Sequence, residues 1–537
     1  MMKFDADWVP REEARRAFVA EHGLYRPEDE HASCGVGLVV AVDGKPSRKV
    51  VENGIDALKA VWHRGAVDAD GKTGDGAGIH VQVPVPFFCD QIRRTGHEPH
   101  PDRLIAVGQV FLPRTDFGAQ EACRTIVETE VLRMGYYIYG WRHVPVNTEV
   151  LGEKANATRP EIEQILISNS KGVDEETFER ELYVIRRRIE KAAAAAQVPG
   201  LYLCSLSCRS VIYKGMMLAE QVAEFYPDLL DPRFESAFAI YHQRYSTNTF
   251  PQWWLAQPFR MLAHNGGINT LKGNLNWLRS HEIRMASSAF GDLAEDIKPI
   301  VAQGSSDSAA LDSVFEVLVR AGRNAPMAKT MLVPEAWSQA AIELPKPWRD
   351  MYAHMNSVME PWDGPAALAM TDGRWVCGGL GRNGLRPMRH VVTGGGLLIA
   401  GSETGMVPTD EHAVREKGAL GPGRMIAVDM REGRLYHDSE LKDLLSASQP
   451  FGEWLEKVHE LDDTLSGPDE VTLYEGGELR KRQIAAGFTI EEVETILAPM
   501  AEEAKEAVAS MGDDTPSAVL SEKYRPLSHF FRQNFAR

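Results

Sequence analysis

The sequence predicts an α+β protein in which antiparallel sheets carry helices on their outer faces. Three observations predict this class: short β-branched runs bounded by turn residues, helical patterns between them, and a late group of paired strands joined by glycine turns. Clusters of strands separated by clusters of helices are typical of this arrangement, because each sheet must bury an apolar face against another layer.

The strand signals begin at Cys34, where the run Cys-Gly-Val-Gly-Leu-Val-Val-Ala-Val ends at the turn Asp43-Gly44. A continuous apolar run of this length predicts a buried strand. Further strands are expected at 78–83, 201–213, 236–245 and 260–268, with hairpins at 366–379 and around the turns at 394–396 and 432–433. Helices are expected at 119–134, 175–196 and 309–320, and Asp307 is expected to be the N-cap of the last one.

The domain organisation follows from where these signals change. Residues 1–33 have the character of a polar helix or arm. The strand signals fade after about residue 428, and the remainder is helix-rich, with a capping-box start at Thr489-Ile-Glu-Glu. We therefore expect one domain at 34–430 and a second, helix-rich domain at 431–537.

Length and composition bound the class of protein. A chain of 537 residues is too long for one ordinary core, and its 44% hydrophobic content supports a sizeable interior. The 59 basic and 76 acidic residues leave a net charge of −17, which argues against nucleic acid or an anionic membrane surface as the main partner.

Neither a membrane span nor a secretion signal is expected. The sequence contains no run of ~20 apolar residues, and its first thirty residues are charged throughout. Six cysteines in a chain of this length form no disulfide framework, which favours the cytoplasm. The close pair Cys204 and Cys208 is expected to be two buried thiols, and no metal site is predicted.

Four short segments hold more glycine, asparagine, histidine and charge than a core requires. Taken singly, each has a structural interpretation as a turn, a helix cap or a surface ion pair. The segments are Ser33-Cys34-Gly35-Val36-Gly37, His242-Gln243-Arg244-Tyr245-Ser246-Thr247, Ala263-His264-Asn265-Gly266-Gly267 and Gly304-Ser305-Ser306-Asp307-Ser308. In this order they resemble the motifs of the class II glutamine amidotransferases, which are N-terminal nucleophile hydrolases.

Further motifs narrow the resemblance to the glutaminase domain of glutamate synthase large subunits, over nearly all of the chain from Cys34 onward. These motifs lie at 63–66 (HRGA), 72–78 (KTGDGAG), 381–387 (GRNGLRP), 510–516 (SMGDDTP) and 530–535 (FFRQNF). The resemblance implies a four-layer αββα sandwich for the first domain. It also implies that the helix-rich segment is the start of the glutamate synthase central domain.

The chemistry of such a site explains its residue types. Releasing ammonia from an unactivated amide requires a nucleophile, a base and donors for an oxyanion. A deprotonated thiol is a strong nucleophile, and the α-amine of an N-terminal cysteine, with a pKa near ~7.7–8.0, can take its proton. The resemblance assigns Cys34 as nucleophile and Asn265 and Gly266 as oxyanion donors.

The resemblance also assigns the binding of glutamine. Arg244 can hold the α-carboxylate through two parallel hydrogen bonds, and Asp307 can pair with the α-ammonium. Arg64, Gly267 and His264 are secondary candidates. Lys72 and Asp75 are either scaffold or functional residues, and the segment from Arg382 to Arg386 is expected to be structural.

Two segments have competing interpretations. Because thirty-three residues precede Cys34, its nitrogen is an amide, and we expect cleavage between Ser33 and Cys34 to release the amine. The alternative is that residues 1–33 are an ordinary arm. The segment from Thr249 to Trp254 resembles a loop that closes over glutamine, although its two tryptophans could instead pack against the second domain.

The resemblance implies a larger reaction than this chain can perform. In such enzymes ammonia passes to 2-oxoglutarate at an FMN site, and the imine is reduced with electrons delivered through iron–sulfur clusters. The electron donor is either NADPH through a small subunit or ferredoxin. The sequence has no cysteine cluster and no FMN barrel, so we expect a fragment that is at most a glutaminase. The alternatives are another class II amidotransferase and a catalytically silent, unprocessed module.

Overall fold

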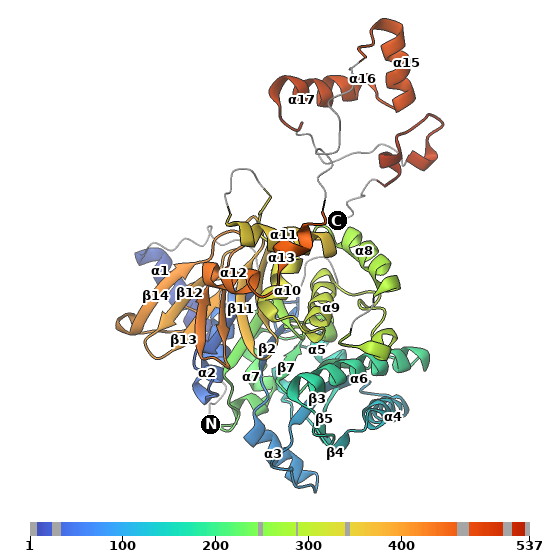
Figure 1. Cartoon of the computed structure of the whole chain (residues 1–537). Helices are drawn as coiled ribbons and strands as arrows, with labels where there is room; N and C mark the ends of the chain where they lie inside the picture. The colour runs from blue at the N-terminus through green and yellow to red at the C-terminus, as the bar shows by residue number, and fades with distance from the viewer. Residues whose placement is uncertain are drawn as a thin grey trace. The chain divides into compact units, whose positions relative to one another are not determined.

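The chain is described here by a computed structural model that covers residues 8–23, 34–244, 251–285, 288–338, 344–458, 472–507 and 518–531 (Figure 1). It divides into two compact units, Met1–Glu456 and Lys457–Arg537. The predicted α+β class is confirmed, because the first unit is built from antiparallel sheets with helices on their outer faces. Within the described ranges, no helix combines the length and apolar character needed to cross a membrane.

The strand after Cys34, β1 (Gly35–Ala41), lies in the middle of a seven-stranded antiparallel sheet. All seven of its residues are buried, as its continuous apolar run predicts. Its pairing with β8 places Gly35 opposite Gln243. In order across the sheet, the strands are β14 (Val414–Ala419), β12 (Arg389–Thr393), β13 (Leu397–Gly401), β1, β8 (Phe238–Gln243), β2 (Ala77–Gln82) and β7 (Ser210–Gly215).

A five-stranded antiparallel sheet packs face to face against the first. Alternate side chains of both sheets, including Leu38, Ile240, Ala367 and Ile426, form one buried apolar layer between them. The edge strand β9 lies against β1 and β8, which brings its end close to Cys34. In order, the strands are β16 (Arg434–His437), β15 (Met425–Asp429), β11 (Trp375–Leu380), β10 (Ala366–Thr371) and β9 (Leu262–Gly266).

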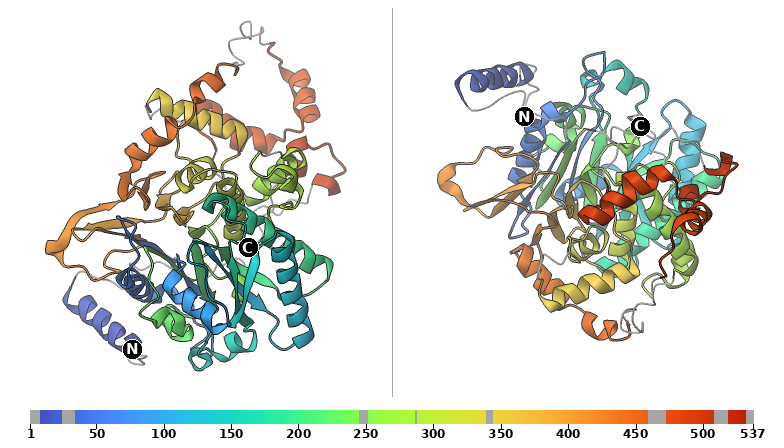
Figure 2. Two further views of the ribbon diagram at one scale, coloured as in Figure 1. Left: turned by 60° about the horizontal axis from the view of Figure 1, so that its bottom comes forward. Right: turned by 90° about the horizontal axis from the view of Figure 1, so that it is seen from above.

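Helices cover the outer faces of both sheets. The amphipathic helix α2 (Arg48–Ala60) packs on β1, β2 and β8, and its N-cap Ser47 accepts a hydrogen bond from Val50 N. The five-stranded sheet is covered on its outer side by α9 (Asp307–Arg320), α10 (Ala325–Leu332), α11 (Lys346–Val358) and α12 (Asp438–Ser446). The first unit thus contains a helix–sheet–sheet–helix stack, and the N-terminal helix α1 (Trp8–His22) lies at its periphery in both views of Figure 2.

A third, four-stranded antiparallel sheet lies beside the first, and the turn between β6 and β7 connects the two. The helices α4 (Phe117–Arg133) and α6 (Glu175–Ala195) cover one of its faces. The predicted strand at 201–213 is here two strands in different sheets, because Ser207 Oγ accepts hydrogen bonds from Arg209 N and Ser210 N and turns the chain. The strands are β4 (Tyr137–His143), β5 (Glu161–Ser168), β3 (Ile105–Leu112) and β6 (Tyr202–Ser207).

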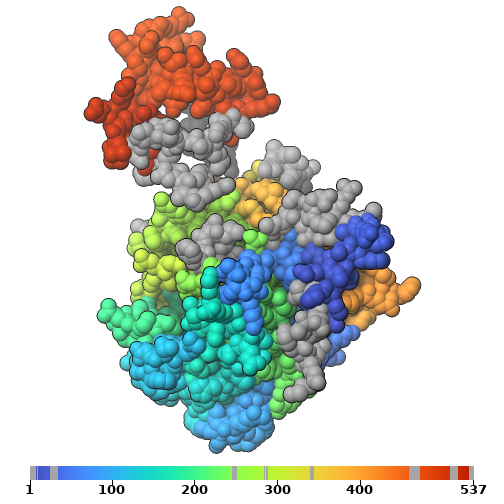
Figure 3. Space-filling model, turned by 180° about the vertical axis from the view of Figure 1, so that it is seen from behind, coloured from blue at the N-terminus to red at the C-terminus, as the bar shows by residue number. Residues whose placement is uncertain are grey.

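The remaining helices of the first unit are short connectors or lie on the surface. Figure 3 shows α1 on the surface of this unit, where it borders a cavity of about 310 Å³ that is also lined by residues 403–406. The connecting helices are α3 (Val85–Arg94), α5 (Glu153–Ala157), α7 (Val222–Phe225), α8 (Leu271–Arg284) and α13 (Phe451–Leu455).

The second unit contains α15 (Gly476–Ala486), α16 (Ile490–Glu492) and α17 (Ala498–Glu503), and no strand occurs among its described residues. The predicted capping box is confirmed: Thr489 accepts from Glu492 N, and the Glu492 side chain accepts from Thr489 N. The boundary expected near 430 remains a prediction. In the structure β15 and β16 lie on either side of residue 430, and the first compact unit extends to Glu456.

Candidate active site

The ends of strands from the two facing sheets bring together the residues that carry the motifs. Cys34 directly precedes β1, while Asn265 and Gly266 are the last two residues of β9. The side-chain Nδ2 of Asn265 donates a hydrogen bond to the carbonyl oxygen of Cys34 at 2.7 Å. This contact joins the seven-stranded sheet to the edge of the five-stranded sheet at the predicted nucleophile.

Arg244 lies beside Cys34 because of the strand register. Since Gly35 pairs with Gln243, the residues that follow outward, Cys34 and Arg244, are neighbours across the two strands. Arg244 has a φ of 90°, which is strained for a residue with a side chain, and its backbone N–H donates to Gly76 O at 2.9 Å. Such strained positions persist only where the surroundings fix them, and they cluster at functional sites.

The Cys34 thiol is half-buried, and this controls its ionisation. Burial raises the pKa of the thiol to about 11, and the positive charges of Arg244 and Arg386 only partly oppose the rise, while Asp75 adds to it. A thiol with this pKa is almost fully protonated at neutral pH. The site therefore needs a separate base before Cys34 can act as a nucleophile.

Asp307 lies at the turn that follows β9. Its Oδ2 accepts from Ile268 N at 3.0 Å, and its Oδ1 accepts from Ser308 N at 2.8 Å. The prediction that Asp307 is the N-cap of α9 is wrong, because Ser306 is the N-cap and accepts from Ala309 N. Asp307 is instead the first helical residue, and its carboxylate faces Gly267 and Ile268.

The two glycines after Asn265 have different roles in the backbone. Gly266 has a φ of 146°, and a Cβ atom there would lie 1.6 Å from Pro365 O, so a side chain cannot be accommodated. Gly267 donates its N–H to Pro365 O at 3.0 Å, which holds the turn against the start of β10.

His264 positions the strand end from the opposite face of β9. Its Nδ1 lies 2.7 Å from Ser308 Oγ, and burial lowers the pKa of its ring, which keeps the ring neutral. Its backbone is held by Gln257, whose Oε1 accepts from His264 N at 2.7 Å and whose Nε2 donates to His264 O at 3.2 Å. Gln257 thus holds the outer edge of β9 one residue before Asn265, where His242 Nε2 also lies 3.2 Å from His264 O.

Arg64 belongs to the 3-10 turn Trp62–Arg64 and contacts an acidic side chain from a distant loop. Its Nε donates to Glu403 Oε1 at 2.6 Å, and His63 Nε2 lies 3.0 Å from the same oxygen. These contacts hold the pKa of Glu403 below its ordinary value against the effect of burial.

The glycine-rich segment that follows, which includes Lys72 and Asp75, is fixed by internal contacts. Asp75 and Ala66 exchange hydrogen bonds, with the Asp75 carboxylate accepting from Ala66 N at 3.2 Å and the Asp75 N–H donating to Ala66 O at 3.2 Å. Lys72 Nζ donates to Glu149 O at 2.5 Å, so the side chain of this exposed lysine is held by a backbone carbonyl.

Trp253 does not form part of an exposed loop. It is buried, and its Nε1 donates to Ala155 O at 3.1 Å. Several predicted features lie outside the described residues. They are Ser33 and the cleavage site, the positions 245–247 of the second motif, the residues 249–250 that begin the glutamine loop, the motif at 510–516 and the positions 532–535 of the last motif.

The roles of the motif residues remain predictions, and the structure shows supporting residues that their sequence patterns did not indicate. Gln257 and Glu403 had no recognisable signal, because each acts through one long-range contact. Ser308 belongs to the fourth motif segment, but the sequence indicated no role for it. The expected structural role of Arg386 remains a prediction, and its positive charge also acts to lower the pKa of Cys34.

Comparisons with known proteins give consistent matches. A family model described as "Glutamine amidotransferases class-II" matches residues 34–454, and one described as "Glutamate synthase central domain" matches residues 481–537. The first match begins at Cys34.

Three relatives cover nearly the whole chain. The glutamate synthase (NADPH) large chain of Azospirillum brasilense is 63% identical over 98% of this chain and 35% of the relative. The corresponding large chain of Bacillus subtilis is 40% identical over 96% of this chain and 34% of the relative. Ferredoxin-dependent glutamate synthase 2 of Synechocystis is 41% identical over 95% of this chain and 32% of the relative. The chain therefore spans about a third of the length of these curated relatives.

Proposed function

The chain belongs to the class II glutamine amidotransferases, and from this membership we propose that it hydrolyses L-glutamine to L-glutamate and ammonia at Cys34. One observation carries the proposal: Asn265 of one sheet donates a hydrogen bond to Cys34 at the start of the other, beside Arg244. In this proposal the nucleophile, an oxyanion donor and the cation that binds the carboxylate would all lie at one end of the sandwich.

Because the pKa of the Cys34 thiol is raised, the proposed reaction needs a base that removes the thiol proton. We propose that the chain is cleaved between Ser33 and Cys34, so that residues 1–33 are a pro-segment. The α-amine released by this cleavage would take the thiol proton, because its pKa of ~7.7–8.0 lies near the operating pH. While Ser33 remains attached, the nitrogen is an amide without basicity and the thiol stays protonated.

In the proposed reaction, Cys34 sulfur attacks the side-chain amide carbon of glutamine. The resulting tetrahedral oxyanion accepts hydrogen bonds from Asn265 Nδ2 and Gly266 N–H. The ammonium form of the terminal amine then protonates the leaving nitrogen, ammonia departs, and a thioester remains. Water adds to the thioester, the carbon–sulfur bond breaks, and glutamate and the free thiol are restored.

The other site residues would bind the amino-acid end of glutamine. Arg244 would hold the α-carboxylate and Asp307 the α-ammonium, an arrangement that leaves the side-chain amide directed toward Cys34. Arg64, Gly267 and His264 would act in support, since their contacts fix the loops around the nucleophile. The helix–sheet–sheet–helix stack supports assignment of the domain to the four-layer N-terminal nucleophile hydrolase fold.

The chain is the glutamine amidotransferase domain of a glutamate synthase large chain together with part of its central domain. For the whole enzyme we propose that the ammonia formed here reacts with 2-oxoglutarate and that the product is reduced to L-glutamate in the cytoplasm. The 63% identity to an NADPH-type large chain favours NADPH and a small subunit over ferredoxin as the source of electrons. We keep 34–430 and 431–537 as the proposed domain limits.

FMN and an iron–sulfur cluster are implied for the whole enzyme, and the described cysteines do not fit an iron–sulfur cluster. Cysteine contributes to neither of the two groups of potential metal ligands in the described part of the chain. Cys123, Cys204 and Cys377 are buried, whereas Cys208, which was expected to be buried like Cys204, is only half-buried. We therefore propose that the iron–sulfur cluster is bound by another part of the enzyme.

Glutamine turnover tests the proposal. Processed protein should release glutamate and ammonia, and Cys34→Ala should abolish the release. Cys89→Ala is the matched control, because Cys89 is also half-buried and lies on α3. Full turnover by Cys34→Ala, or equal loss in both variants, would contradict the assignment of the nucleophile.

A further inference from the structure

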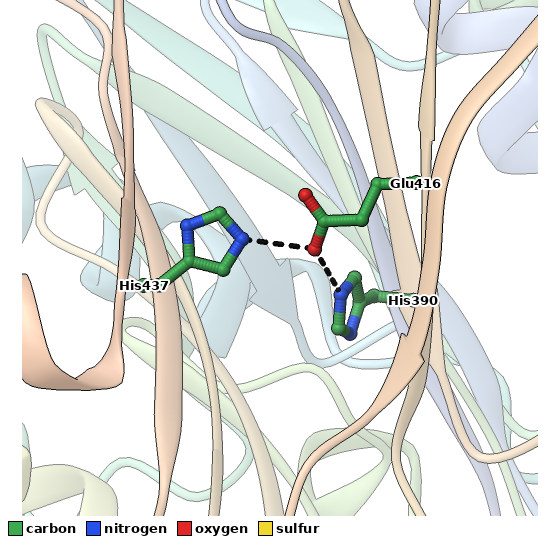
Figure 4. Close-up of side chains that lie close together, drawn as sticks. All are labelled: His390, Glu416 and His437. Carbon is green, nitrogen blue, oxygen red and sulfur yellow. Dashed lines mark hydrogen bonds and ion pairs between the residues drawn. The ribbon is translucent and has the colours of Figure 1, made fainter.

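A cluster of two histidines and a glutamate lies at the rim of the sheet sandwich, on the side of β12 and β14, which are two and three strands from β1. His390 of β12, Glu416 of β14 and His437 of β16 point toward one another (Figure 4). The first two strands belong to the seven-stranded sheet, and β16 is the edge strand of the five-stranded sheet. The cluster therefore connects the edges of the two sheets, and nothing in the proposed glutamine chemistry uses it.

The strand register explains why these side chains meet. Val392 pairs with Glu416, and Ile426 pairs with His437. Both apolar partners belong to the buried layer between the sheets, so the polar side chains end that layer at its margin. His390 pairs with Gly418, where a Cβ atom would lie 2.4 Å from His390 Cε1. The glycine thus leaves the space in which the His390 ring lies against β14.

The ligand-type atoms already surround one point. Glu416 Oε1 lies 2.9 Å from His390 Nε2 and 2.8 Å from His437 Nε2, and all three atoms lie within 4.8 Å of one another. Zinc–nitrogen and zinc–oxygen bonds of ~2.0–2.2 Å at tetrahedral angles would separate such ligands by roughly 3.3–3.5 Å. The two short contacts need to open by only about half an ångström to admit an ion.

Burial and a further carboxylate support binding. The His390 side chain is 8% exposed, whereas Glu416 and His437 are 38% and 48% exposed, so an ion can reach the cluster from solvent. His437 Nδ1 lies 3.6 Å from Glu440 Oε2. Glu440 also accepts from His437 N at 3.1 Å and from Arg434 at 3.0 Å, which fixes its position. Glu440 thus lies near the second ring nitrogen of His437, where a hydrogen-bonded carboxylate commonly supports a metal-binding histidine.

We propose that His390, Glu416 and His437 bind one divalent transition-metal ion of the zinc class. Two imidazoles and one carboxylate suit Zn²⁺, Ni²⁺ or Cu²⁺, whereas Ca²⁺ and Mg²⁺ prefer an oxygen shell. Three protein ligands leave a fourth position for water. Bound here, the ion ties β12 and β14 of one sheet to β16 of the other.

The chain offers a matched control in the cluster of His143, Glu161 and Glu163, whose ligand-type atoms lie equally close together. Glu163 is already neutralised there, because Arg124 donates to its Oε1 at 2.5 Å and to its Oε2 at 2.9 Å. A metal ion at this second cluster would have to displace the arginine. Of the two clusters among the described residues, only the rim cluster is therefore expected to bind an ion.

Two titrations of the chelator-treated full-length chain test the proposal. Binding of Zn²⁺ is measured by calorimetry, and binding of Co²⁺ is measured by visible absorption. We expect one ion per chain and a Co²⁺ spectrum without thiolate-to-metal absorption. Glu416→Gln and His437→Gln should each weaken binding by about 100-fold or more, and Glu440→Gln by about 10-fold. His143→Gln should leave the affinity unchanged.

His437 and Glu416 are both partly exposed, so these variants should fold, and circular dichroism checks that they do. The proposal fails if the folded chain binds no Zn²⁺ at micromolar concentrations. It also fails if His437→Gln and Glu416→Gln bind as tightly as the parent chain, or if His143→Gln loses as much affinity as they do. A Co²⁺ spectrum dominated by thiolate absorption would place the ion on a cysteine instead.

Discussion

Replacing Asn265 with alanine removes the side-chain amide that joins β9 to the nucleophile. The side chain is fully buried, and its Nδ2 lies 2.7 Å from the carbonyl oxygen of Cys34. An amide nitrogen carries two N–H groups, so one can hold Cys34 while the other donates to the oxyanion of the substrate. The variant therefore loses a contact in the resting protein and a second one in the transition state.

These two losses differ in size and in the quantity that reports them. Removal of one oxyanion donor lowers kcat by a factor of ~10²–10³, or about 2.7–4 kcal/mol. Loss of the buried hydrogen bond to Cys34 lowers the free energy of unfolding by about 1–2 kcal/mol. Because the oxyanion forms only in the transition state, KM for glutamine should change much less than kcat.

The assay is steady-state release of glutamate by processed protein, together with urea unfolding. Asn274→Ala is the matched control. Asn274 lies on α8, is also buried, and its Nδ2 donates a hydrogen bond to Pro361 O at 3.0 Å. The control should lose similar stability and keep its kcat. The reasoning is refuted if Asn265→Ala retains kcat, or if Asn274→Ala loses as much kcat as Asn265→Ala.

Three further predictions address binding, support and ionisation. Asp307→Asn should raise KM for glutamine by ~10–100-fold with a smaller change in kcat, because a charge-assisted hydrogen bond is worth ~1.5–3 kcal/mol. An unchanged KM in steady-state kinetics would contradict the binding role of Asp307. Gln257→Met keeps the side-chain length but removes the two hydrogen bonds that the Gln257 side chain makes to the His264 backbone. We expect kcat to fall by ~10–100-fold. A loss of stability alone would show that Gln257 only supports the fold. In chains that retain Ser33, the rate of iodoacetamide alkylation of Cys34 should rise about tenfold per pH unit from pH 7 to 10. Burial raises the pKa of the thiol to about 11, so the reactive thiolate accumulates only as the pH approaches that value. Arg244→Gln removes a charge that lowers this pKa, so it should slow alkylation further at each pH, and a rate that levels off below pH 9 would contradict the raised pKa.

A simple burial pattern made some strands predictable, although the equally buried β3 was missed. β1 is buried on both faces and reads as one apolar run, and the late hairpins are joined by glycine turns. The strand β5 was missed because it carries Glu161, Glu163 and Gln164 among its apolar residues. Glu163 is buried only because Arg124 neutralises it, and such a partner cannot be inferred from local periodicity.

Local ambiguity explains the error at α9. Ser306 and Asp307 are adjacent, and both residue types cap helices well, so the pattern alone could not choose between them. The structure uses Ser306 as the cap and turns the Asp307 carboxylate toward the strand β9. The motif residues of the site were predictable because their types carry chemistry, whereas Gln257 was not, since its role depends on one contact with a folded backbone.

The most direct test of the central claim is reaction with diazo-oxonorleucine, an electrophilic analogue of glutamine, followed by mass spectrometric mapping and N-terminal sequencing. We predict a single adduct on Cys34 sulfur, in chains whose first residue is Cys34, and no adduct in chains that retain Ser33. Equal labelling of Cys34 in chains that retain Ser33 would contradict the role of the terminal amine. An adduct on another residue would contradict the assignment of Cys34 as the nucleophile.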